Sequence, residues 1–288
     1  VAGQKRKREE PKLHIELLPK QEKFVFERGV DEIMYGGAAG GGKSAAQCIA
    51  ALLYAIDYPG STQLMLRRTF VELEGSLIKE HFKHFPGEPW YKYNSSKHVG
   101  TLWNGSTIRF GYCASENDVF QYQGAEFDVI CIDEATQLKE EWLRQFAACL
   151  RGVNEFPKRM YYTCNPGGPG HGYIKRLFID RRYEPGESGE DYAFIPARVT
   201  DNQALLESQP EYVRQLEALP PKLRAAWLEG KWDVLAGQVF QEFTDDPAHY
   251  EDRRWTHVIK PFDVPREWNV YRSYDFGYAK PFSCGWWA

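Results

Sequence analysis

The stretch EIMYGGAAGGGKSAAQCIAALLYAI, residues 32–56, decides the fold class. An apolar run enters a glycine-rich turn, and good helix formers then follow with helical spacing. The turn from Gly37 to Ser44 fits the pattern GxxxxGK followed by Ser or Thr, and it lies between a strand and a helix as that pattern requires. We therefore predict a loop whose backbone amides bind phosphate groups.

The side chains of this loop have separate predicted roles. Lys43 reaches the β and γ oxygens of a nucleotide, and the hydroxyl of Ser44 binds Mg²⁺. The backbone around the phosphates is that of Gly37, Ala38, Ala39, Gly40, Gly41 and Gly42. The sequence thus predicts ATP and Mg²⁺ as cofactors.

Two acids close a second apolar run, FDVICIDE, residues 127–134. A run that stays apolar until its end is typical of a strand buried on both faces. Asp133 is placed to hold the Mg²⁺, and Glu134 to orient and deprotonate a water that attacks the γ-phosphate. The pair predicts an ATP-hydrolysing enzyme with Lys43 and Glu134 as its catalytic residues.

Two amide side chains are further candidates. Asn165 follows the strand-like run in RMYYTCNPGG, residues 159–168, where it would sense the γ-phosphate; the alternative is a turn-forming Asn before Pro166. Gln21 would read the edge of the adenine through its amide, and the alternative is an exposed helix glutamine.

The rest of the first 200 residues indicates an α/β fold with a largely parallel sheet flanked by helices. A second strand, residues 63–67, is followed by a helical pattern over residues 70–82. The segment HVGTLWNGSTIRFGY, residues 98–112, predicts a hairpin that is either an insertion or a sheet edge, with Asn104 and Gly105 in a type I′ turn. Since several strands end in polar or glycine residues, we expect the chemistry at the carboxyl edge of the sheet.

Changes of character along the chain predict four regions. Residues 1–200 form the nucleotide-binding core, and residues 201–243 form a small helical lid whose two short helices are separated by Pro220 and Pro221. Residues 244–265 are a polar linker. Residues 266–288 begin a new strand pair, the first strands of a further domain.

Composition excludes several classes of protein. A formal net charge of -4 argues against a protein that coats nucleic acid, since such binding needs clustered cations. No apolar run approaches the roughly 18 residues of a membrane span. The six cysteines form no CxxC pair, and we expect free thiols, of which Cys131 and Cys164 pack in the core.

With these motifs in view, the chain resembles the large terminase subunit of tailed bacteriophages. The motifs that carry the resemblance are FDVICIDEATQ (127–137), TCNPGGPGHGYIKRLF (163–178), TDNQALL (200–206), LRAAWLEGKWDV (223–234) and YDFGYAKPFSC (274–284). It implies a P-loop ATPase domain of the ASCE class, RecA-like, in which Asp133 binds Mg²⁺ and Glu134 is the catalytic base. Thr163, Cys164 and Asn165 would be the coupling motif.

The resemblance also implies a C-terminal nuclease of the RNase H type, which cuts DNA with two Mg²⁺ or Mn²⁺ ions held by carboxylates. Asp275, in RSYDFGYA, matches the first metal ligand of that site. The remaining ligands would lie past Ala288. We therefore expect this chain as given to lack nuclease activity.

One position departs from the family pattern. Several members place an arginine finger, which acts on a neighbour's ATP, where this chain has Gln123 before Gly124. Arg67 and Arg68 are the first candidates to replace it, because they end a strand at the nucleotide edge. Arg144 and Arg151 are the further candidates, and each of the four arginines has a structural or DNA-facing role as its alternative.

The function that the resemblance implies is that of a motor which moves double-stranded viral DNA into a procapsid. Its partners would be DNA, the portal protein of the procapsid, the small terminase subunit and further copies of itself in a ring. It would work in the bacterial host's cytoplasm, transiently at the portal, and not in a membrane. The alternative is a helicase or repair ATPase with the same loop. A nucleotide-binding switch or kinase is disfavoured by Glu134.

Overall fold

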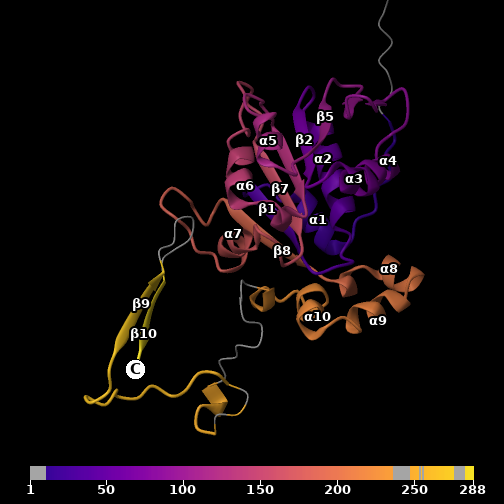
Figure 1. Cartoon of the computed structure of the whole chain (residues 1–288). Helices are drawn as coiled ribbons and strands as arrows, with labels where there is room; N and C mark the ends of the chain where they lie inside the picture. The colour runs from indigo at the N-terminus through magenta and orange to yellow at the C-terminus, as the bar shows by residue number, and fades with distance from the viewer. Residues whose placement is uncertain (1–10, 236–246, 253, 255, 276–282) are drawn as a thin grey trace, which may run out of the picture. The chain divides into compact units, whose positions relative to one another are not determined.

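A mostly parallel β-sheet forms the centre of the first part of the chain (Figure 1). Over the described residues it has eight strands in the order β3-β4-β5-β2-β6-β7-β1-β8. The strands are β1 (Glu32–Gly37), β2 (Thr62–Arg67), β3 (Tyr91–Asn94), β4 (Val99–Leu102), β5 (Thr107–Tyr112), β6 (Val129–Asp133), β7 (Arg159–Cys164) and β8 (Tyr192–Ala197). Neighbours from β5 to β8 are parallel, and β3 and β4 are antiparallel at one edge. The predicted fold class is confirmed.

The structure, a computed structural model, describes residues 11–235, 247–252, 254, 256–275 and 283–288. It consists of two compact units, residues 1–236 and 237–288. The helices of the first unit are α1 (Pro19–Phe26), α2 (Lys43–Asp57), α3 (Phe70–Leu73), η1 (Glu74–Ile78), α4 (Lys79–His84), α5 (Glu116–Phe120), η2 (Ala135–Gln137), α6 (Glu140–Ala147), α7 (His171–Ile174), η3 (Lys175–Ile179), η4 (Val199–Asp201), α8 (Gln203–Ser208), α9 (Glu211–Glu217), α10 (Pro221–Trp227) and η5 (Asp233–Leu235). Across the described ranges, no helix is long and apolar enough to span a membrane.

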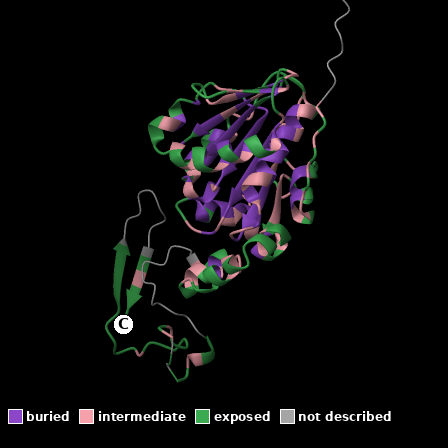
Figure 2. Ribbon diagram, turned by 90° about the vertical axis from the view of Figure 1, so that its right-hand side faces the viewer, coloured by how far each residue is buried: buried purple, intermediate pink, exposed green. Residues whose placement is uncertain are grey.

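Helices cover both faces of the sheet, so its central strands are buried on both sides (Figure 2). Alternate residues of β6 show this arrangement. Val129 and Cys131 join a core that includes residues of α1 and α2, whereas Ile130 and Ile132 join a core with residues of α6 and η3. Each fully buried apolar side chain of this size contributes about 2 kcal/mol to folding. This two-sided burial explains the unbroken apolar runs in the sequence.

The predicted hairpin is formed by β4 and β5, next to the edge strand β3, but its turn is not of type I′. That type needs positive φ at both central residues, and only Gly105 has it, at 88°. Asn104 instead uses its side chain: Nδ2 donates to the Ala55 carbonyl at 2.7 Å, and Oδ1 accepts from the Ser106 amide at 3.1 Å. The bond to Ala55 in α2 and the bond within the turn together favour this longer turn over the dipeptide's local preference.

The helical pattern over residues 70–82 is confirmed, with one irregularity. A π-helical segment, η1, separates α3 from α4. Thr69 caps the start, where its side chain accepts a hydrogen bond from the Glu72 amide. The wider π turn carries Ser76, whose hydroxyl donates to the Glu72 carbonyl at 2.7 Å. Such turns are frequent at functional sites.

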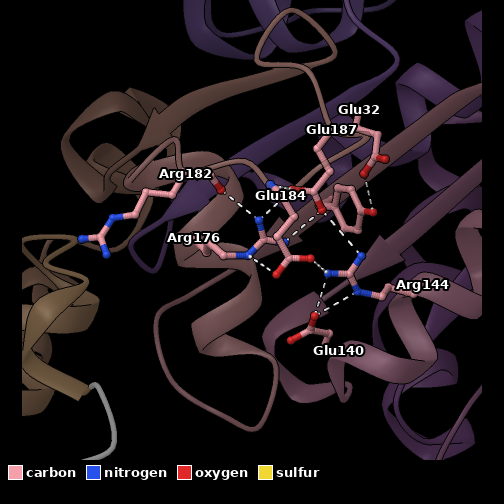
Figure 3. A network of polar contacts seen from close by, with 8 residues as sticks. Glu32, Glu140, Arg144, Arg176, Arg182, Glu184 and Glu187 are labelled. Carbon is pink, nitrogen blue, oxygen red and sulfur yellow. Dashed lines mark hydrogen bonds and ion pairs between the residues drawn. The ribbon is translucent and has the colours of Figure 1, made fainter. Parts of the chain in front are cut away.

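A network of charges ties the segment after η3 to α6 (Figure 3). Arg176 makes a bidentate pair with Glu187 at 2.7 and 3.0 Å. Arg144 on α6 lies 2.9 Å from Glu184 and 2.8 Å from Glu140. Forked arginine pairs of this kind fix geometry as well as charge. The network therefore holds the loop that leads into β8.

The second unit contains a short 3₁₀ turn, η6 (Pro247–His249), and a hairpin of β9 (Tyr271–Asp275) and β10 (Ser283–Trp287). The strands are antiparallel, with Asp275 opposite Ser283. A strand pair was predicted here, and it is present. Residues 236–246 and 276–282, parts of the predicted lid, linker and strand segment, lie outside the described residues.

Candidate functional site

Four neighbouring parallel strands bring the predicted residues to one edge of the sheet. The glycine-rich loop follows β1, and Arg67 ends β2. Asp133 ends β6, and Asn165 follows the last residue of β7. Because β2, β6, β7 and β1 are consecutive and parallel, these carboxyl ends lie side by side.

Glycine is required at several points of the loop. Gly37, Gly40 and Gly42 have positive φ values of 107°, 76° and 70°, which other L-residues rarely adopt. Gly36, at the end of β1, meets a different limit. A Cβ atom there would lie 2.3 Å from the carbonyl oxygen of Cys164 on β7. The loop is therefore fixed by its own backbone and by close approach to the neighbouring strand.

Lys43 opens α2 and is only 8% exposed. Its Nζ donates to the Ala38 carbonyl at 2.7 Å and to Asn165 Oδ1 at 2.8 Å. The other side of the Asn165 amide, Nδ2, lies 3.4 Å from Glu134 Oε1. Asn165 therefore connects the cation of the loop with the predicted catalytic carboxylate.

Asp133 is almost fully buried, and its carboxylate has three polar contacts. It accepts hydrogen bonds from the hydroxyl of Thr163 and, at 3.3 Å, from that of Ser44. Its third contact is an ion pair of 3.1 Å with Nη1 of Arg67. Thr163, part of the coupling motif that the family resemblance implies, thus positions the predicted metal ligand.

Glu134 has a left-handed backbone conformation, with φ 53° and ψ 48°. This conformation is uncommon for a residue with a Cβ atom, and such residues concentrate at functional sites. Burial raises the pKa of its carboxyl group, while the positive charge of Lys43 acts in the opposite direction. A raised pKa strengthens a carboxylate as a proton acceptor.

A cavity of about 670 Å³ opens beside these residues. Arg67, Glu134 and Asn165 form part of its wall on the side of the sheet. Leu223 and Trp227 of α10 also line it. They belong to the helical segment, which runs from Asn202, the cap residue of α8, through α9 to the end of α10 at Trp227. A space of this size, lined by convergent polar groups, is typical of a ligand site.

The helical segment also binds the loop directly, through contacts that the sequence did not predict. The Ala39 amide donates to the carbonyl of Trp227 at 2.8 Å, and Asn202 Nδ2 donates to the carbonyl of Gly40 at 2.8 Å. Both partners belong to motifs of the family resemblance, TDNQALL and LRAAWLEGKWDV. The two motifs marked this part of the sequence as relevant to the family, but nothing in them indicated which atoms of the loop their residues contact.

Gln21 on α1 is 5% exposed, so it is not an exposed helix glutamine. Its Nε2 donates to the Gly42 carbonyl at 2.9 Å, and its Oε1 accepts from the Leu18 amide at 2.9 Å. The side chain therefore supports the loop from outside. Reading of an adenine edge stays a prediction.

The candidate arginines differ in their surroundings. Arg67 points to Asp133 of its own site, and Arg68 is exposed at the same cavity. Arg144 is held by the network of Figure 3. Arg151 is about half exposed and lies 3.9 Å from Glu126. A finger that reaches a neighbouring subunit stays a prediction, with Arg68 the more accessible of the two first candidates.

Two further predicted residues contribute no described side-chain contact to this constellation. Cys164 is buried in the core, with Sγ 3.6 Å from Sδ of Met34, so it reaches the site only through its backbone. Asp275 ends β9 in the second unit, and its side chain is outside the described residues.

The sheet topology and the glycine-rich loop between β1 and α2 are those of the P-loop fold class. The sequence pattern of the family described as terminase large subunit, T4likevirus-type, N-terminal, matches residues 34–244. This match spans well over half of the 288 residues, and the chain belongs to that family. No curated protein matches the sequence.

Solved structures of large terminases have a similar fold. The large terminase of a thermophilic bacteriophage, in complex with ADP, has a TM-score of 0.64 and 18% identity, over 94% of this chain and 65% of that one. The large terminase ATPase domain of Thermus phage P74-26 has a TM-score of 0.53 and 14% identity, over 76% of this chain and 94% of that one. This chain thus spans just under two thirds of the ADP-bound terminase.

Proposed function

We propose that this chain hydrolyses Mg·ATP at the carboxyl edge of its sheet. The single observation that carries the proposal is the hydrogen-bonded line from Lys43 through Asn165 to Glu134. It joins the predicted phosphate-binding cation to a partly buried carboxylate that lines the cavity. Lys43, Asn165 and Glu134 come from three different parts of the chain, and the fold brings them together.

The residues present fit a magnesium ion. Ser44 and Asp133 supply hard oxygen donors 3.3 Å apart, and Mg²⁺ is commonly held by one or two protein oxygens together with phosphates and waters. Within the described residues no group of three or more His, Cys, Asp or Glu side chains could hold a metal ion, and such a site does not need one. Bound there, the ion would neutralise charge on the phosphate oxygens.

Glu134 acts in this proposal as the base that takes a proton from the attacking water. Burial raises its pKa and so favours proton acceptance, and the cavity gives the water its place. Lys43 exchanges its bond to Asn165 for the terminal phosphate of the nucleotide. The hydrogen bonding of Asn165 therefore changes when that phosphate binds, and its other partner, Glu134, is affected. The hydroxyl of Thr136 fixes the backbone of Asn165 by donating a hydrogen bond to its carbonyl at 2.8 Å.

We further propose that hydrolysis drives the packaging of double-stranded viral DNA. Family membership supports this, as does the likeness in fold to the large terminase of the thermophilic bacteriophage, which was crystallised with ADP and with ATP-γ-S. The proposed partners are a portal on the procapsid, a small terminase subunit and other copies of the chain in a ring, within the bacterial host. Asp275 is proposed as a nuclease metal ligand, with Mg²⁺ or Mn²⁺, in the complete protein.

ATP turnover and nucleotide binding together test the catalytic roles. Lys43→Ala should lose nucleotide binding, because the phosphate charge is then uncompensated. Glu134→Gln should bind a fluorescent ADP analogue with unchanged affinity and lose ATP turnover by at least about a hundredfold, since only the proton acceptor is removed. Equal loss of binding in the two variants would contradict this division of roles.

DNA entry into procapsids tests the packaging role. The complete protein should protect DNA from added nuclease only when portal-bearing procapsids and ATP are present. Absence of protected DNA in a reconstituted system with measurable ATP turnover would contradict it. Unwinding of a duplex in a strand-displacement assay would instead support a helicase.

A further inference from the structure

Arg67 has an unusual place for a residue at a nucleotide site. Its guanidinium lies on Asp133, the predicted metal ligand, with Nη1 3.1 Å from Oδ2. Ser44 Oγ lies 3.3 Å from that same carboxylate oxygen. The arginine therefore occupies the side of Asp133 where the two predicted metal ligands converge.

The charges of the site explain this contact. Asp133 is 1% exposed, and a buried carboxylate without a positive partner is strongly destabilising. The other buried cation nearby, Lys43, is engaged with Ala38 and Asn165 instead. Arg67 therefore compensates the charge of Asp133.

One nitrogen atom of the Arg67 guanidinium is held by a hydrogen bond, and another is unpaired among the described residues. Its Nη1 also donates to the hydroxyl of Ser76, in the π turn that follows β2. Its Nε is buried and has no hydrogen-bond partner among the described residues. Glu72 Oε2 and Gln137 Oε1, which line the same cavity as Arg67, are likewise unpartnered within the described part of the chain. Unpaired acceptors are therefore present in residues of the cavity wall, where a guanidinium that leaves Asp133 would move.

We propose that Arg67 is an exchangeable counter-ion, which holds Asp133 in the nucleotide-free site and yields this carboxylate when Mg²⁺ is taken up with a nucleotide. The proposal rests on the proposed function of the site. Two cations cannot share one buried carboxylate oxygen without repulsion, so Arg67 must withdraw. It then enters the cavity beside Glu134 and Asn165, where the terminal phosphate is expected. Arg67 is thus a positioning residue that acts within its own subunit.

The test is the magnesium dependence of binding of a fluorescent ADP analogue at fixed nucleotide concentration. Arg67→Gln should lower the half-saturating Mg²⁺ concentration about tenfold, because the competing ion pair is gone. Arg68→Gln is the matched control, since Arg68 lines the same cavity without contacting Asp133; it should stay within about twofold of the wild type. ATP turnover in Arg67→Gln should fall even though Mg·nucleotide binds more readily.

A second variant keeps the test decisive if Arg67→Gln does not fold. Ser76→Ala removes the hydroxyl that holds the guanidinium and leaves Arg67 in place. It should lower the same Mg²⁺ midpoint about two- to threefold, as expected for one lost hydrogen bond. An unchanged or higher midpoint in the folded variants would overturn the proposal. Failure of the wild type to bind the analogue at any Mg²⁺ concentration would instead overturn the proposed function.

Discussion

Gly36 shows how one missing side chain sets the spacing of the site. Its α-carbon lies so close to β7 that a methyl group would meet the Cys164 carbonyl at 2.3 Å, and that oxygen is part of the backbone. We expect Gly36→Ala to lower the free energy of unfolding by about 2 kcal/mol or more, because strand β1 must shift. Urea unfolding measures this change.

Gly75→Ala is the matched control for this substitution. Gly75 lies in η1, and a Cβ atom there would have no neighbour within 4 Å. The unfolding free energy should be unchanged or rise by about 0.5–1 kcal/mol, since alanine restricts the unfolded chain. Equal destabilisation by both substitutions would show that the contact with β7 is not the cause.

Glu32 is a partly buried carboxyl group at the opposite end of β1. Burial raises its pKa from 4.5 to about 7, and Tyr162 donates a hydrogen bond to it at 2.7 Å. Because the folded state favours the neutral form, stability from this group is complete below pH 4.5. It falls as the pH rises to about 7 and then stays constant.

We therefore expect the unfolding free energy of the wild type to fall relative to Glu32→Gln by on the order of 2 kcal/mol between pH 4.5 and pH 7. Glutamine keeps an acceptor for Tyr162 and cannot ionise. Urea unfolding across this pH range measures the difference. Glu207→Gln, at an exposed position of α8, should follow the wild type. Parallel curves for the wild type and Glu32→Gln would contradict the prediction.

At the scale of elements, the short helices α8 to α10 are joined to the loop by hydrogen bonds of single residues. Asn202 is both a helix cap and a contact with the loop. Its Oδ1 accepts a hydrogen bond from the Leu205 amide at 3.2 Å and so caps α8, and its Nδ2 donates to the Gly40 carbonyl. A short helix depends strongly on its cap and on such contacts. Asn202 therefore connects the stability of the helical segment to that of the loop.

Asn202→Ala should accelerate amide hydrogen exchange in α8 to α10 and in the loop, but not in β6. The cost of the lost cap and hydrogen bond is about 1–2 kcal/mol, or roughly tenfold in local opening. Ser208→Ala removes a hydroxyl that bonds only to carbonyls within α8, and it should leave the exchange of the loop unchanged. Equal exchange in both variants would contradict the connection.

At the scale of the whole molecule, all contacts of the candidate site described above lie within residues 1–236. A fragment of these residues should unfold in one cooperative transition and bind a fluorescent ADP analogue with an affinity within about twofold of the full chain, because compact units keep their own cores. Calorimetry and fluorescence titration measure both properties. A large loss of affinity would show that residues 237–288 contribute to the site.

Sequence reasoning predicted the strands and helices with strong patterns and missed those without them. β1, β2, β6 and β7 follow from unbroken apolar runs, whereas β8 is only partly buried and α5 is short; α6 was missed although its buried Trp142, Leu143 and Phe146 have helical spacing. The predicted type I′ turn was wrong because Asn104 bonds to α2, a partner that is 49 residues away in sequence. Local preference cannot register such a contact.

The sequence by itself determined the class of fold, the glycine-rich loop between a strand and a helix, and the position of Asp133 and Glu134 after a buried strand, because these depend on local pattern and spacing. Only the tertiary structure decided which groups meet. Asn165 lies between Lys43 and Glu134, and the guanidinium of Arg67 lies on Asp133 of its own subunit. The physical reason is that parallel pairing aligns the ends of strands distant in sequence, and burial of Asp133 then selects the nearest cation as its partner.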